Sequence, residues 1–212
     1  KPQSSSLGCG QVLHCPYTAD KARIVVQEMI DGISLELVEK RLVTDQLVLT
    51  VGYDIENLTR PEIRKVYKGP VTTDRYGRRV PKHAHGTWNL PRATSSSSEL
   101  LEAMAALYDK IVNPALLIRR MSLSACHVVN EKMAKEREQK ETFEQLDLFT
   151  DYAKKEAKEK EEQKKRERER RMQEALLTIK KKYGKNAVLR GMNFEEGATA
   201  KERNGQIGGH QA

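Results

Sequence analysis

The hydrophobic positions of residues 1–130 repeat with two different periods. In the segment Thr18–Val38 the apolar residues recur every three or four positions, which predicts a helix with one buried stripe and with Thr18 as its N-cap. A second segment of this kind follows the serine run Ser95–Ser98 and reaches Val112. Residues 47–53 instead alternate between apolar and polar side chains, as a half-buried strand does.

Three further segments complete the predicted sheet. Gln11–His14, Thr87–Leu90 and Leu117–Val129 are short, apolar or alternating, and we interpret each as a strand. The resulting order, β-α-β-β-α-β, predicts an α+β fold: a four-stranded antiparallel sheet with two helices on one face. The other face is left open, and the alternation places these residues on it: Thr50, Thr87, Asn89, Arg120, Ser122 and Ser124. Such a surface suits a phosphate backbone, although an ordinary solvated sheet face has the same pattern.

The composition changes after residue 130, where Lys, Glu and Arg begin to dominate. We expect a globular domain (1–130) with a basic insertion (55–86), a linker (131–150), a long charged helix (151–183) and an irregular Gly-rich tail (184–212). Supportive charge pairs favour the helix. At its C-terminal end the apolar residues form one stripe, which indicates either a plain spacer arm or a docking face: Met172, Leu176, Ile179 and Tyr183.

The positive charge is concentrated in the insertion. The chain has a net charge of +8, and residues 55–86 carry 8 Lys and Arg against 3 Asp and Glu. These cations are interleaved with Tyr67 and Tyr76, a composition that favours contact with a nucleic-acid backbone. A solubilising loop has the same composition, so both interpretations stay open. A hairpin is expected near Asp74–Gly77.

Cysteine usage and hydropathy set the expected compartment. The three cysteines lack CxxC spacing, which argues against a disulfide framework and suits a reducing cytoplasm. No apolar run reaches the length of a membrane span, and the start at Lys1 without a signal-peptide pattern is interpreted as a cut end. We therefore expect a cytoplasmic chain without a membrane partner.

Known catalytic and metal-binding patterns are not found. The acidic residues of the globular part are scattered and form no carboxylate cluster for two metal ions. The pairs His14/Cys15 and Cys126/His127 lack the spacing of a zinc site, and no P-loop is present. The sequence therefore predicts no catalytic residue, no metal site and no cofactor in this chain.

Two segments resemble a known family. The stretch "HGTWNLPRATSSSSELLEAMAALYDKIVNPALLIRRMSLSA" from His85, together with Ser6–Gly8 before the first strand, resembles the little finger domain of Y-family translesion DNA polymerases. The insertion "YKGPVTTDRYGRRVPKHAHGT" and the end "RNGQIGGHQA" look like the UmuC-like (ImpB/MucB/SamB) branch of bacteria and their phages. Cys9 is a departure, because an arginine often stands at that position in the family.

The resemblance implies a C-terminal part of a polymerase that grips primer-template duplex DNA. With the open face and the insertion, it gives this set of expected DNA contacts: Ser6, Gly8, Arg75, Arg78, Arg79, Thr87, Arg119, Arg120 and Ser122. Magnesium-dependent nucleotidyl transfer would belong to the remaining polymerase domains, N-terminal to this chain. The alternative is a stand-alone nucleic-acid-binding or scaffold protein with a charged helical arm.

A short motif in the linker points to a second partner. The residues Gln145, Leu146, Asp147, Leu148 and Phe149 look like the pentapeptide that binds the bacterial sliding clamp. The resemblance implies that the glutamine enters a small polar pocket while the last two residues fill an apolar one. The alternative is an apolar cluster that caps a helix and folds back onto the domain.

Overall fold

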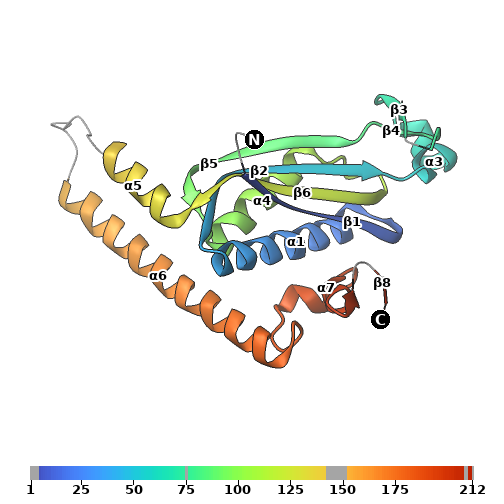
Figure 1. The fold of residues 1–212 in the computed structure, drawn as a ribbon. Helices are drawn as coiled ribbons and strands as arrows, with labels where there is room; N and C mark the ends of the chain where they lie inside the picture. The colour runs from blue at the N-terminus through green and yellow to red at the C-terminus, as the bar shows by residue number, and fades with distance from the viewer. Residues whose placement is uncertain (1–4, 75, 142–151, 208–209, 212) are drawn as a thin grey trace.

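A four-stranded antiparallel sheet forms the centre of the fold (Figure 1). The computed structural model describes residues 5–74, 76–141, 152–207 and 210–211, with side chains described for 5–74, 76–137 and 160–205. The strands lie in the order β1 (Ser5–Tyr17), β6 (Ile118–Asn130), β2 (Leu42–Tyr53) and β5 (Ala84–Thr94), and all neighbours are antiparallel. The predicted α+β fold class is confirmed.

Two helices cover one face of this sheet, α1 (Ala19–Glu39) and α4 (Ser97–Ile111) (Figure 1). The helical stripes predicted from the sequence point inward, so that Ile33 and Met104 join Leu123 of β6 in one buried core. Burying a side chain of this size contributes about 1.5–3 kcal/mol. The apolar periodicity thus accounts for the layer that shields one side of the sheet.

The two covering helices begin in different ways. Ser96 is the N-cap of α4, and its Oγ accepts a hydrogen bond of 3.2 Å from the backbone N–H of Glu99, as the serine run predicts. Thr18 holds the N-cap position of α1, but its side chain makes no capping hydrogen bond. The predicted N-cap position of Thr18 is therefore confirmed, but the predicted capping hydrogen bond is not formed.

The basic insertion folds into small elements at one end of the sheet (Figure 1). These are α2 (Glu56–Thr59), α3 (Pro61–Val66), β3 (Val71–Thr73) and β4 (Arg79–Pro81). Gly77, with φ of +77°, completes the predicted hairpin turn, and its N–H donates to the carbonyl of Asp74. Buried Asn57 donates to the carbonyls of Asp54 and Leu117, both at 2.8 Å, and accepts from the Leu117 N–H at 2.7 Å. The amide of Asn57 therefore fixes the insertion to the sheet.

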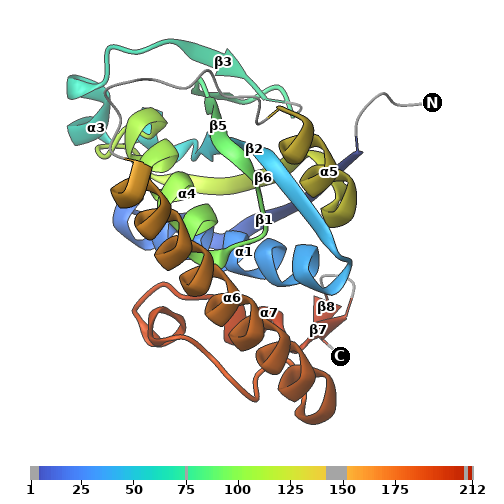
Figure 2. The same cartoon turned by 90° about the vertical axis from the view of Figure 1, so that its left-hand side faces the viewer.

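Two helices follow the sheet, α5 (Glu131–Glu141) and α6 (Tyr152–Tyr183) (Figure 2). The charged helix is confirmed as α6. α5 occupies the first part of the segment expected as a linker, and Asn130 caps it by accepting from the Lys132 N–H at 3.0 Å. In the described part of the chain, no helix is both long and apolar enough to span a membrane.

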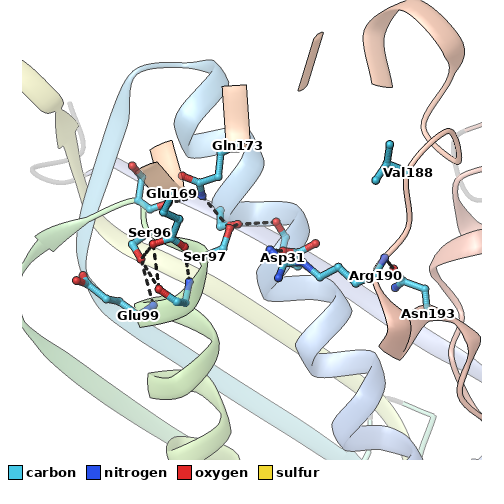
Figure 3. Close-up of polar contacts among 12 residues, drawn as sticks. Asp31, Ser96, Ser97, Glu99, Glu169, Gln173, Val188, Arg190 and Asn193 are labelled. Carbon is cyan, nitrogen blue, oxygen red and sulfur yellow. Dashed lines mark hydrogen bonds and ion pairs between the residues drawn. The ribbon is translucent and has the colours of Figure 1, made fainter. Parts of the chain in front are cut away.

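α6 contacts the domain through polar groups at the start of α4 (Figure 3). Gln173 is 1 % exposed and donates to the carbonyl of Ser95 at 3.0 Å and to the Oγ of Ser97 at 2.8 Å. The carboxylate of Glu169 accepts from the N–H of Ser98 at 2.8 Å. We call this set the α4–α6 contact; it places a negative charge at the N-terminus of α4, where the helix dipole favours one.

The tail also packs on the domain, by hydrogen bonds. Its elements are η1 (Gly191–Phe194), α7 (Ala200–Arg203), β7 (Gln206–Ile207) and β8 (His210–Gln211). Glu28 of α1 is 3 % exposed and accepts from the N–H groups of Thr199 and Ala200 and from the side-chain amide of Asn193, at 2.8–3.0 Å. The sequence predicted an irregular tail with little core, and the structure supplies polar anchors instead.

An ion pair joins α1 to the segment after α6 (Figure 3). Arg190 Nη2 lies 2.8 Å from Asp31 Oδ1, and Lys180 donates to the carbonyls of Lys185 and Val188, both at 2.7 Å. Burial raises the pKa of Asp31 above its ordinary value and lowers the pKa of Lys180. Each of these half-buried charges thus has a polar partner, Asp31 a guanidinium and Lys180 two carbonyls.

Candidate nucleic-acid interface

The register of the four strands arranges the uncovered face of the sheet in rows. The first row is Gly10, Ser122, Thr50 and His85, and the second is Gly8, Ser124, Val48 and Thr87. All eight are exposed or half-buried, whereas the alternate residues Met121, Leu123 and Ala125 are buried. We call these eight residues the open face. Each of the six residues that the sequence predicted for the uncovered side is exposed or half-buried.

Small residues keep side chains from projecting far above the strands of the open face. A Cβ atom at Gly8 would lie 2.9 Å from the Oγ of Ser124, so this position has no room for a side chain. Thr50 Oγ1 and His85 Nδ1 lie 2.9 Å apart and share a hydrogen bond. With short polar side chains in both rows, a sugar-phosphate backbone can approach the strands closely.

Arg120 extends the open face toward the insertion. A Cβ atom at Gly52 would lie 2.5 Å from Arg120 Cγ and 2.6 Å from its Nε, so the absence of a side chain at Gly52 lets the arginine lie across β2. Among the described residues Arg120 has no hydrogen-bond or ion-pair partner, and it is exposed. Its guanidinium is therefore available to an external anion.

Arg119, unlike Arg120, has an ion-pair partner among the described residues. Its Nε lies 3.8 Å from Oδ2 of Asp54, whose side chain is nearly buried beside the insertion. An ion pair at that distance is weak. The two neighbouring arginines thus differ in their partners, although both line the same cavity beside the insertion.

The arginines of the hairpin also divide. Arg78 donates to Asp74 Oδ2 through Nε at 2.9 Å and through Nη2 at 2.7 Å, and its Cζ lies 5.0 Å from the ring centroid of Tyr76. The bonded guanidinium holds the pKa of Asp74 below its usual value. Arg79 is exposed and has no partner in the part of the chain that the structure describes, and Arg75 lies outside that part.

The other expected contacts are exposed. Gly8, Thr87 and Ser122 belong to the open face, and Ser6 is exposed two residues before Gly8 on β1. The residues predicted for the open face left out Gly10, Val48 and His85. Continuing the period-two alternation along β1, β2 and β5 would have included them.

Cys9 takes no part in this surface. Its side chain packs with the core on the helix side of the sheet, and burial raises the pKa of its thiol to about 11. The position at which the family often has an arginine is therefore turned away from the open face.

Metal-binding groups do not gather in the described residues, where no three His, Cys, Asp or Glu side chains lie close enough to hold an ion. His127 Nδ1 instead lies 2.9 Å from Asp45 Oδ1. The ring of His14 stands edge-on to Tyr17, with centroids 5.7 Å apart. Each histidine of the two Cys/His pairs thus has a protein partner.

The expected clamp-binding residues Gln145–Phe149 lie outside the described residues.

Comparisons with known proteins complete the description. No family model matches the sequence, and no curated protein matches it. Among solved structures, the chain is similar to the one titled "Complex of beta-clamp processivity factor and little finger domain of PolIV". The identity is 9 % and the TM-score 0.37, and the match covers 69 % of this chain and 100 % of that one.

Proposed function

We propose that this chain binds duplex DNA by its phosphate backbone, as the C-terminal DNA-gripping part of a lesion-bypass DNA polymerase. The observation that carries the proposal is the open face, a surface of glycines, hydroxyls, Val48 and His85 that ends at Arg120, which has no side-chain partner among the described residues. Hydroxyls, backbone amides and arginines are the groups that hold phosphate oxygens. The assignment to the UmuC-like branch rests on the sequence segments alone and is part of the proposal.

Contact with the backbone is favoured over reading of bases. Base reading requires an element that enters a groove and presents long side chains to base edges. The open face is instead a sheet of short side chains, with the basic insertion at one end (Figure 1). Binding of this kind is largely independent of sequence and strongly dependent on salt. We assign magnesium-dependent nucleotidyl transfer to the preceding polymerase domains, whereas this chain holds the duplex.

The first prediction concerns the salt dependence of duplex binding. Replacing Arg120 by alanine should flatten the slope of log K against log salt by about 0.9, because one phosphate contact is lost. Arg79→Ala should do the same, and the fourfold variant that also lacks Arg78 and Arg119 should lose most of the slope. Fluorescence anisotropy with a blunt labelled duplex over a salt series measures this.

The matched control is Arg23→Ala. Arg23 donates two hydrogen bonds of 3.0 Å to Asp109 on the helix side of the sheet, away from the open face. Its loss should leave the slope unchanged. An unchanged slope in the fourfold variant would remove this surface from the proposal.

We also propose that Gln145–Phe149 tethers the chain to a sliding clamp. The support is the motif itself: three apolar residues stand among Glu, Thr and Asp in a polar arm. A few apolar anchors supply most of the energy in peptide interfaces of this kind. In the sequence this segment lies between α5 and α6, the two helices that follow the last strand of the sheet.

The second prediction tests this tether. The double variant Leu148→Ala, Phe149→Ala should bind a purified bacterial clamp about a hundredfold more weakly, because burying each side chain contributes about 1.5–3 kcal/mol. Calorimetric titration measures the affinity. Duplex binding by the same variant serves as the control and should be unchanged. Equal clamp affinities for the two proteins would favour the alternative, an apolar cap folded onto the domain.

A further inference from the structure

A cavity lies between the end of the sheet and the basic insertion. Its volume is about 430 Å³, within the range of roughly 300–1,000 Å³ in which small molecules bind. β1, β2, the hairpin and β6 all contribute to its lining, which includes Val12, Asp54, Tyr76, Arg119 and Arg120. Three of the expected backbone contacts, Arg78, Arg119 and Arg120, lie along its lining, whereas Val12 and Tyr76 were not among them.

The cavity has an apolar, aromatic wall that is open to solvent. Val12 is 71 % exposed and Tyr76 is 65 % exposed, although both are large apolar side chains. The guanidinium of Arg78 lies over the ring of Tyr76, and this cation–π contact helps to hold the ring in place. Exposed aromatic rings beside cations are the groups on which unpaired bases stack.

The opposite wall carries the positive charge. Arg120 has no partner among the described residues, and Arg119 is held only by the loose 3.8 Å pair with Asp54. Each carboxylate of the lining has a cationic partner: Asp54 lies beside Arg119, Glu56 is paired with Arg60, and Asp74 is paired with Arg78. A phosphate group can therefore approach the two arginines.

We propose that this cavity seats one unpaired nucleotide of a DNA strand. Its base stacks against Tyr76 and Val12, and Arg119 and Arg120 hold its phosphate. The seat rests on the proposed function, since it lies where a strand leaving the open face would reach the insertion. Stacking is tolerant of sequence, so we expect all four bases to be accepted.

The third prediction tests this seat with two labelled DNAs, a blunt duplex and the same duplex with a single-stranded overhang. The intact chain should bind the overhang DNA about tenfold more tightly, and Tyr76→Ala should abolish this preference, because stacking contributes about 1–3 kcal/mol per base. The blunt duplex should bind equally to both proteins. A 2-aminopurine in the overhang should lose fluorescence on binding to the intact chain and keep it with Tyr76→Ala.

Two control variants sharpen the result. Tyr76→Phe keeps the ring and should retain the preference, and Tyr183→Ala removes an equally exposed tyrosine from α6 and should change nothing. Equal affinity of the intact chain for both DNAs would overturn the seat and leave the proposed function standing. Failure to bind either DNA would overturn both. The same fluorescence signal can be titrated with free 2-aminopurine deoxynucleoside monophosphate. If the intact chain binds this free nucleotide more tightly than the overhang DNA, the cavity is a site for free nucleotides and the strand proposal is overturned.

Discussion

Whether an arginine of this chain is available to an external anion depends on its partner within the protein. Arg119 and Arg120 are neighbours in sequence, yet one pairs with Asp54 and the other is free of described partners. Strand alternation predicted the outward position of Arg120. It could not predict the pairing of Arg119, because Asp54 comes into reach only when β2 and β6 are aligned.

Glu28 shows the same limit. In the sequence it is a polar position on an amphipathic helix, where exposure is the ordinary expectation. Its acceptance of hydrogen bonds from Thr199 and Ala200 depends on a segment that follows much later in the chain. No local pattern carries that information, so the anchor of the tail could not be predicted.

The fourth prediction concerns Glu28. Glu28→Ala removes the acceptor of two backbone N–H groups and should lower the free energy of unfolding by about 1–3 kcal/mol. Hydrogen exchange should show faster exchange at Thr199 and Ala200, and urea unfolding should show the loss of stability. Glu196→Ala is the control, because the side chain of this tail residue is exposed and its partner among the described residues is Lys21. Unaltered exchange at Thr199 and Ala200 would refute the anchor.

At the scale of elements, periodicity predicted the helices and strands that build the core. It placed the first strand at Gln11–His14, whereas β1 runs over Ser5–Tyr17, because backbone pairing with β6 needs no apolar side chains. It also missed α5, whose residues have no apolar stripe. The order of elements could therefore be predicted, but not their full length.

The apolar stripe of α6 left open whether the helix docks, and it did not predict the residue that docks. Of the stripe, Leu176 is half-buried, whereas Met172, Ile179 and Tyr183 are exposed and the polar Gln173 is buried. The face that contacts the domain is chosen by hydrogen-bond partners at the start of α4. A hydrophobic pattern gives no signal for such a contact.

The fifth prediction tests the α4–α6 contact. The double variant Glu169→Ala, Gln173→Ala should weaken docking by about 1–3 kcal/mol, since the polar groups at the start of α4 lose their partners. Amides of α6 should then exchange faster while those of β2 and β6 keep their protection. Glu162→Ala is the matched control, because the partner of this residue among the described side chains is Arg166 on the same helix. Equal protection of α6 in all three proteins would contradict the contact.

At the scale of the molecule, the layers separate the open face from α6 and the tail. The open face lies on one side of the sheet, and α1 and α4 lie on the other (Figure 1). α6 and the tail pack beyond these helices (Figure 2). Duplex bound to the open face, as proposed, would therefore leave α6 and the tail uncovered.

The strand order also bears on how the chain is made. β6 lies between β1 and β2 and is the last of the four strands to be synthesised. Gly10 of β1 therefore cannot pair with Ser122 until β6 has been made. Closing such a long loop has an entropic cost, and sheets with distant partners fold slowly. Until Asn130 has been synthesised, neither β1 nor the inner edge of β2 has the strand with which it pairs in the native sheet. Unpaired strand edges of this kind can pair with other chains, so we expect the incomplete domain to aggregate more readily than the finished one.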